Sequence, residues 1–261
     1  MWKKNKLRIL GSLLIMSIVL NITGCSNYKS ENDNENVNKN KSYSEVALEV
    51  LEERYGEPFE LKQIGGTFGA YRNTKKLILN PVSNPNTYCF VEVEADKTEV
   101  YDDYADRIME ERFAVMLEEE AKKIFDEEIN IKVFFNPFYD RYSYLDMEPL
   151  EFYKDNVHSQ HGISIFVNSD GNIDKNEEGE KLIKFADKVI NMGLNKDSSI
   201  WVWYCKEETY NEIDKSYYNV ILEENLYKYY SDKGKTYSNV DIEILDKNIR
   251  QNIDELINRF D

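Results

Sequence analysis

The longest periodic stretch of the sequence, from about Val100 to Phe125, constrains the fold most. Its apolar residues recur every three or four positions, which predicts an amphipathic helix with one buried face. This stripe consists of Tyr101, Ala105, Ile108, Met109, Phe113, Met116, Leu117 and Ile124. Tyr88–Ala95, just before it, alternates apolar and acidic residues and predicts a half-buried strand. A helix that follows such a strand favours an α+β fold.

The residues before this strand complete a first α+β unit, which we place at 43–127. Ser42 and Glu45 have the spacing of a capping box, and Gly56 occupies the position that commonly ends a helix, so a helix lies between them. Strands are expected at Phe59–Ile64 and Ala70–Leu79. The glycines Gly65, Gly66 and Gly69 supply the turn between these strands. The unit is therefore a helix, an antiparallel sheet of three strands and the long helix.

Residues 128–261 are expected to form a second, small α+β unit. Strands are predicted at Asn130–Phe135, Gly162–Val167 and Ser199–Cys205, with Tyr217–Leu222 as the antiparallel neighbour of the last one. Helices are predicted at Leu150–Asn156, between Asp174 and Gly193, and at the end of the chain. The final helix would carry Leu245, Ile249, Ile253, Leu256, Ile257 and Phe260. This order is that of a split βαβ arrangement. The two units are separate domains or pack as one; the sequence leaves both open.

The first 20 residues have the features of a secretory signal. Four basic residues, Lys3, Lys4, Lys6 and Arg8, precede an apolar run from Ile9 to Leu20. As a helix this run rises about 18 Å, which is shorter than the ~20 residues that span a bilayer.

Ile22-Thr23-Gly24-Cys25, directly after this run, resembles the lipobox of bacterial lipoproteins. The resemblance implies that residues 1–24 are a cleaved signal peptide and that Cys25 carries a diacylglyceryl thioether. It places the mature protein at the outer face of the cytoplasmic membrane. Residues 25–42 would be the lipidated cysteine and a disordered tether, since Ser26–Lys41 is rich in Asn, Ser and charged residues. An uncleaved membrane anchor is the alternative.

The charge of the chain excludes some partners. The signal segment holds four of the 33 basic residues and no acidic residue, which leaves 29 basic against 49 acidic residues and a formal charge of −20. Such a surface repels nucleic acid and anionic lipid headgroups. We therefore expect no nucleic-acid partner, and membrane contact through the lipid.

A second resemblance concerns the folded part. Tyr55-Gly56-Glu57-Pro58-Phe59, Tyr88–Val93 and Asp103-Tyr104 are similar to segments of uncharacterised lipoproteins of Gram-positive Firmicutes. The match covers about residues 43–125. It implies no activity, since none is known for that family.

The two histidines, His158 and His161, are the candidates for a metal site. Imidazoles three residues apart can face one cation, but the zincin motif needs a spacing of four with a glutamate inside it. A loop that leads into the strand at Gly162 explains the same residues. A metal-dependent or other cell-surface hydrolase near His158 and His161 is the alternative function.

Asp170, Asn172 and Asp174 resemble the start of a calcium loop, in which oxygen ligands alternate. Lys175 and Lys181 then stand where the motif has a glycine and a bidentate glutamate. A turn at Asp170-Gly171 and a helix cap at Asp174 account for these residues as well. No metal or other cofactor is therefore expected beyond the covalent diacylglycerol on Cys25.

No pattern indicates catalysis. The acidic runs Glu118–Glu120 and Asp126–Glu128 lie beside Lys122 and Lys123, as on a solvated helix surface. The chain has no Gly-x-Ser-x-Gly motif and no phosphate-binding loop. Cys89 and Cys205 lie in strand-like runs, either as a disulfide or as two separately buried thiols.

The 19 tyrosines include two clusters that would suit a binding surface. These clusters are Tyr139, Tyr142 and Tyr144, and Tyr227, Tyr229 and Tyr230. Core packing along strands is the alternative for both. The sequence thus predicts a lipid-anchored, non-enzymatic protein that binds a protein or a cell-envelope partner, with no catalytic residue assigned.

Overall fold

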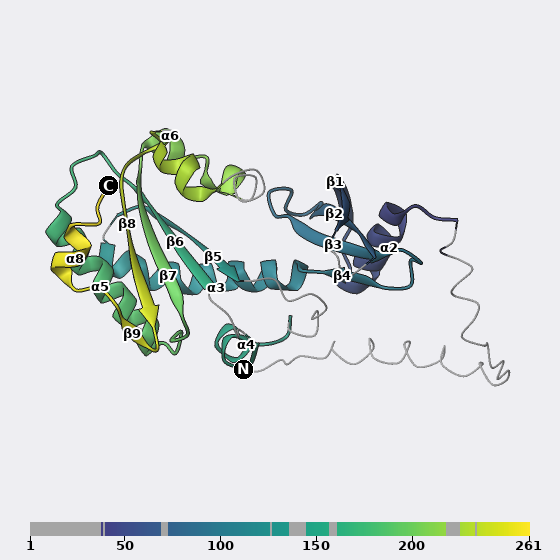
Figure 1. The fold of residues 1–261 in the computed structure, drawn as a ribbon, viewed down its shortest axis with the longest axis horizontal. Helices are drawn as coiled ribbons and strands as arrows, with labels where there is room; N and C mark the ends of the chain where they lie inside the picture. The colour runs from purple at the N-terminus through teal and green to yellow at the C-terminus, as the bar shows by residue number, and fades with distance from the viewer. Residues whose placement is uncertain are drawn as a thin grey trace, which may run out of the picture.

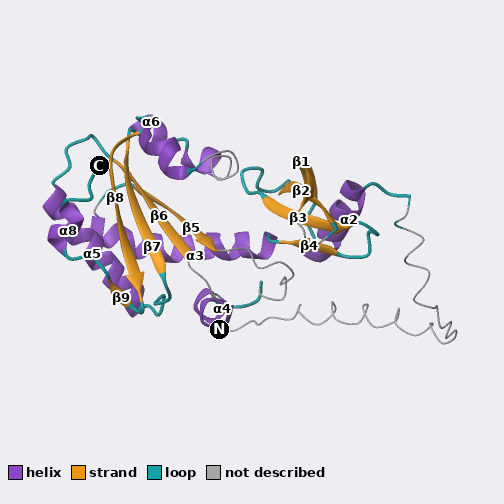
Figure 2. Cartoon of the chain, viewed as in Figure 1, coloured by secondary structure: helices purple, strands orange, loops and turns teal. Residues whose placement is uncertain are grey.

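The structure is a computed structural model that describes residues 38, 40–68, 73–125, 127–135, 145–156, 161–217, 225–232 and 234–261. Within these ranges the strands form a four-stranded and a five-stranded sheet. Figure 1 shows that the helix between the two sheets, α3, joins them and runs along the larger one. Figure 2 shows the same view coloured by secondary structure.

The small sheet is an antiparallel meander packed against α2 (Tyr43–Tyr55). Its strands, in spatial order, are β1 (Phe59–Phe68), β2 (Thr74–Pro81), β3 (Cys89–Glu94) and β4 (Val100–Asp102). The capping box of Ser42 and Glu45 is present, and Gly56 ends α2 at φ 71°, so both predicted helix signals are confirmed. The apolar face of α2 packs on alternate residues of β2 and β3, among them Leu77, Leu79, Val91 and Val93.

The strand β4 replaces what the sequence predicted as the first turn of the long helix. Val100 and Asp102 pair with Val93 and Val91 of β3, so this segment is a fourth strand. The helix α3 spans Tyr104–Phe125. The predicted start of the helix at Val100 was wrong. A buried apolar residue at this position is compatible with the spacing of a helix face and with the alternation of a strand, so the spacing alone does not distinguish them.

The large sheet has the order β5-β6-β7-β8-β9. The pair β6–β7 is parallel and is connected through α5 (Lys175–Asn191), whereas the other neighbours are antiparallel. The strands are β5 (Ile129–Phe135), β6 (His161–Asn168), β7 (Ser198–Cys205), β8 (Thr236–Leu245) and β9 (Asn248–Ile249). The shorter helical elements are α4 (Pro149–Asn156), α6 (Glu207–Tyr210), the π-helical turn η2 (Lys228–Asp232) and α8 (Ile253–Ile257).

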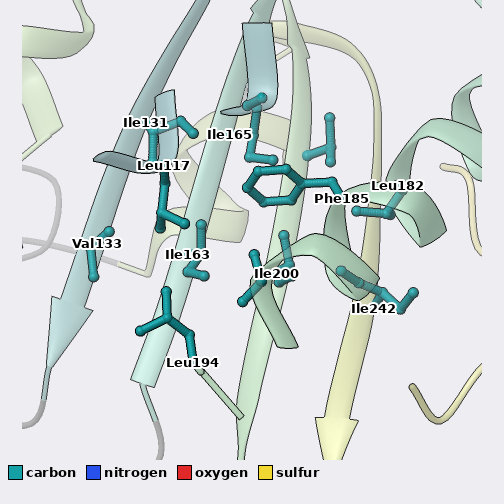
Figure 3. Close-up of a cluster of buried hydrophobic side chains, with 14 of the residues drawn as sticks. Leu117, Ile131, Val133, Ile163, Ile165, Leu182, Phe185, Leu194, Ile200 and Ile242 are labelled. Atoms are coloured by element: carbon teal, nitrogen blue, oxygen red, sulfur yellow. The ribbon is translucent and has the colours of Figure 1, made fainter. Parts of the chain in front are cut away.

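The main core lies between one face of the large sheet and the helices α3, α5 and α8. Every second residue of β5, β6, β7 and β8 points into it, and Leu117, Leu182 and Phe185 of the helices pack against them (Figure 3). The other face carries a second, aromatic cluster, in which residues 213–217 and η2 cover Phe166 and Trp203. The large sheet is therefore the middle layer of three.

The helix α3 belongs to two cores. Tyr104, its first residue, packs with the small sheet, whereas Met109, Phe113, Leu117, Ala121 and Phe125 pack with the large sheet. The junction between the two sheets thus falls in the first two turns of α3.

The end of the chain differs from the prediction. The antiparallel neighbour of β7 is β8, and Tyr217 is helical rather than extended; residues 218–222 lie outside the described residues. The predicted final helix is wrong at Leu245 and Ile249, which lie in β8 and β9 on either side of a turn. Asp246 and Lys247 form that turn with φ of 49° and 67°, which no helix can accommodate.

The predicted α+β fold class is confirmed. In the second half, β6 and β7 are direct neighbours, so the parallel unit is an unsplit βαβ motif and not the split form that the sequence indicated.

Candidate functional site

The most distinctive site in the described residues is a cluster of buried charges at the start of α3. Asp103, Arg107 and Glu110, which we call the ionic triad, are each at most 3% exposed. Arg107 donates through Nη2 to Asp103 Oδ2 at 2.7 Å and through Nη1 to Glu110 Oε2 at 2.5 Å. Their spacing of four and three residues places all three on one face of the helix. The guanidinium of Arg107 is therefore hydrogen-bonded to two buried carboxylates.

The ionic triad connects α3 to both sheets. The backbone N–H of Phe90, in β3 of the small sheet, donates to Asp103 Oδ1 at 2.7 Å. The backbone N–H of Phe135, the last residue of β5 in the large sheet, donates to Glu110 Oε1 at 2.8 Å. Each carboxylate thus binds one strand and the shared arginine.

A neighbouring ion pair continues this polar junction into the small sheet. Asp102 pairs with Arg54 of α2 and accepts a hydrogen bond from Tyr55 Oη at 2.6 Å. The backbone N–H of Tyr104 also donates to Asp102, at 3.0 Å. Burial, followed by the nearby Asp102 carboxylate, raises the pKa of Tyr55, so this hydroxyl stays a donor.

Burial sets the protonation of the ionic triad. It raises the pKa of Glu110 to about 7, against the opposing effects of Arg107 and of the Phe135 N–H. Burial also raises the pKa of Asp103, which Arg107 opposes. A carboxyl with a pKa near neutrality is a feature shared by functional sites and structural ion networks.

His161 lies deep in the core rather than in a ligand site. It is 5% exposed, and neither ring nitrogen has a hydrogen-bond partner among the described residues. Its ring packs against Tyr153 and Phe135, with centroids 5.2 and 6.0 Å away. The apolar gap that it lines with Phe113 and Leu117 has no room for a water molecule. Burial lowers the pKa of His161 to about 4, so the imidazole is neutral at neutral pH. His158 lies outside the described residues.

The oxygen atoms of the calcium-like loop are used by the loop itself. Asp170 accepts from the Asn172 N–H at 2.9 Å, and Asp174 caps α5 by accepting from the N–H groups of Asn176 and Glu177. Within the described ranges, no three His, Cys, Asp or Glu side chains gather so as to hold a metal ion. The turn and cap interpretation accounts for Asp170 and Asp174.

The acidic run at Glu118–Glu120 forms surface ion pairs. Glu118 pairs with Lys122, and Glu120 pairs with both Lys123 and Lys188 of α5. Asp126 lies outside the described residues.

The second tyrosine cluster divides between surface and core. Tyr227 is 37% exposed and meets the partly buried Trp201, which stacks on Trp203 at 5.5 Å. Tyr229 is partly buried beneath Lys235. Tyr230 is fully buried against Phe166 and Trp203, so it offers no contact surface. The first cluster, Tyr139, Tyr142 and Tyr144, lies outside the described residues.

Cys89 and Cys205 are free, buried thiols. Cys89 belongs to the core of the small sheet and Cys205 to the aromatic cluster of the large one. The two cysteines are therefore separately buried thiols and do not form a disulfide with each other. Residues 22–25, which carry the lipobox, lie outside the described residues.

The ionic triad was not predicted from the sequence, although the sequence contains a signal for it. Asp103, Arg107 and Glu110 interleave with the apolar stripe of α3 at helical spacing. Charges of opposite sign at such positions indicate a buried ion network, because isolated charges are too costly to bury.

No protein-family model matches the sequence, and no curated protein matches it either. The fold is similar to that of a solved structure, a DUF5037 family protein from Ruminococcus gnavus ATCC 29149. The sequences are 15% identical, the TM-score is 0.48, and the alignment covers 83% of this chain and 98% of that chain. Along the described residues, no helix is both long and apolar enough to cross a membrane.

Proposed function

We propose that this protein is a bacterial lipoprotein, anchored through Cys25 at the outer face of the cytoplasmic membrane. The observation that carries the proposal is Ile22-Thr23-Gly24-Cys25 after a basic start and a short apolar run. Cleavage ahead of Cys25 leaves a strongly acidic chain, which repels anionic headgroups, so the diacylglycerol provides the attachment.

Metabolic labelling with a fatty-acid analogue tests this proposal. The wild-type chain is expected to incorporate the label and to stay with the cells, whereas Cys25→Ala is expected to do neither. Ser30→Ala, a change in the tether five residues later, serves as the matched control and should behave as the wild type. Equal labelling and equal release of the wild type and Cys25→Ala would rule the proposal out.

At the membrane surface we propose a binding role without catalysis. Tyr227 and Trp201 form a partly exposed aromatic patch backed by Trp203, and such rings provide contact area at a low entropic cost. The charged groups of the ionic triad are covered and hydrogen-bonded, which supports a structural role over contact with a substrate.

Crosslinking on intact cells tests the binding role. A photoreactive residue in place of Tyr227 is expected to capture a protein or cell-envelope partner. Tyr237, which is 48% exposed on β8, provides the control position. Equal capture from both positions, or capture from neither, would contradict the assignment of the patch.

The competing proposal is a metal-dependent hydrolase that uses His158 and His161. Neither ring nitrogen of His161 has a hydrogen-bond partner among the described residues, but its buried, apolar surroundings with no room for a water molecule weigh against this alternative. Metal analysis of the purified full chain distinguishes the proposals. A stoichiometric metal ion that is lost when both histidines are changed to Ala would favour the hydrolase.

A further inference from the structure

We propose that the ionic triad is a proton-operated switch, in which protonation of Glu110 releases the end of β5 from α3. The switch concerns the fold around the junction and is independent of the lipid anchor and of the partner proposed above.

Two physical requirements conflict at Glu110. Both carboxylate oxygens accept hydrogen bonds, from Arg107 and from the Phe135 N–H, so each oxygen of the ionised form has a donor. With Asp103 also ionised, however, the triad holds two negative charges and one positive charge in a buried place. One added proton brings the net charge of the triad to zero. The new O–H group of Glu110, however, then points at the Phe135 N–H, which is also a hydrogen-bond donor. The hydrogen bonds favour the carboxylate, and the charge balance favours the acid.

The proton falls on Glu110 rather than on Asp103. The Asp103 carbonyl accepts from the Arg107 N–H at 3.2 Å, which makes Asp103 the N-cap of α3. The positive end of the helix stabilises a carboxylate at that position, and this effect fades within the first turn. Glu110 lies two turns further along, where the helix terminus gives no such help.

The charged and titratable neighbours of Glu110 come from three elements. Its own helix supplies Arg107, Asp103 and the buried Asp106, one turn before Glu110. The short helix at residues 213–217 supplies Tyr217, a buried phenol that interacts with the Glu110 charge. On β5 the neighbours are the backbone N–H of Phe135 and the Phe134 ring that lies over Arg107. Among these neighbours, Arg107 carries the positive charge next to Glu110.

The hydrogen bond to Phe135 is the one that gives way. The bond between Arg107 and Glu110 Oε2 joins a cation to an acid group, and such bonds are roughly twice as strong as bonds between neutral groups. The proton is therefore expected on Oε1, the oxygen that faces the Phe135 N–H. Since the Phe135 ring packs on Phe113 and Phe152, the released residue also loosens that aromatic contact.

Amide NMR of the full chain in detergent tests the switch. The Phe135 amide resonance is expected to shift with a midpoint near pH 7. The amide resonance of Phe90, whose N–H donates to Asp103, is expected to show no inflection at that pH. Glu110→Gln, which keeps the size and an acceptor oxygen, should abolish the Phe135 inflection. Glu119→Gln, an exposed change on the same helix, should retain it.

A Phe135 amide that stays constant between pH 5.5 and 8.5, or the same inflection in Glu110→Gln, overturns the proposal. Should Glu110→Gln fail to fold, the wild type still decides. With ¹³C-labelled glutamate, a carboxyl resonance titrating near pH 7 supports the switch, and titration of every glutamate below about pH 5.5 refutes it.

Discussion

Glu110 Oε1 accepts a hydrogen bond from the backbone N–H of Phe135 at 2.8 Å, and this bond fastens the second turn of α3 to the last residue of β5. Phe135 faces His161 across the β5–β6 pair, and its ring lines the same apolar gap. The buried charges at the junction and the aromatic core of the large sheet are thereby in direct contact.

Arg107 should be the most sensitive position of the junction. Arg107→Ala leaves two buried carboxylates without their cation, so we expect a loss of about 3–5 kcal/mol in the free energy of unfolding at pH 8. The loss should be smaller at pH 5.5, where the acids take up protons. Urea unfolding measures both values. Lys122→Ala, which removes an exposed ion pair, should change stability by no more than about 0.5 kcal/mol.

Glu110 should make the protein more stable as the pH falls through the neutral range. Its pKa is raised to about 7 in the folded state, so between an unfolded value near 4.5 and pH 7 the folded state binds more protons. Stability is therefore expected to fall by on the order of 3 kcal/mol as the pH rises through this window. Unfolding at several pH values should show a flatter profile for Glu110→Gln than for Glu119→Gln. Parallel profiles would contradict the assignment.

His161 should have the opposite effect on the pH dependence of stability. Its pKa is lowered to about 4 by burial, followed by the charge of Lys196, so the unfolded state binds more protons between pH 4 and 6.5. This contribution to stability is present above about pH 6.5 and is lost as the pH falls. We expect His161→Leu to be more stable than the wild type at pH 5, measured by thermal unfolding. A large loss of stability at pH 7 would instead indicate a polar role for the imidazole.

Asp174 should contribute to stability as a helix cap and not through calcium. Asp174→Ala is expected to lower stability by about 1 kcal/mol, because the N–H groups of Asn176 and Glu177 lose their acceptor. The same loss is expected with calcium and with a chelator. Asp170→Ala, which removes a turn bond to Asn172, is the control. A thermal shift on adding calcium, absent in both variants, would show that the loop is a cation site.

The sequence predicted local features of the fold better than distant pairings. The capping box at Ser42 and the cap at Asp174 depend on neighbouring residues alone, and both are present. The partner of β7 was misassigned because Val240, Ile242 and Ile244 alternate in a stretch dominated by polar and tyrosine residues. Local patterns fix neither strand pairing nor register, which depend on the sheet as a whole.

The site was less predictable than the fold. Asp103, Arg107 and Glu110 have the spacing of a buried ion network, but ion pairs on an exposed helix surface have the same spacing. Their burial depends on β3 and β5, whose positions the sequence does not give. His161, in contrast, attracted attention as a rare residue type, and its surroundings are apolar. A residue's type suggests which chemistry it can perform, but its burial and its hydrogen-bond partners determine whether it can perform that chemistry in the folded protein.

The mass of the mature N-terminal peptide, isolated from the native membrane, tests the proposed anchoring most directly. We predict that it begins at Cys25 and carries a diacylglyceryl group on the sulfur. A peptide that begins at Met1, or an unmodified Cys25 within a longer peptide, would contradict the account.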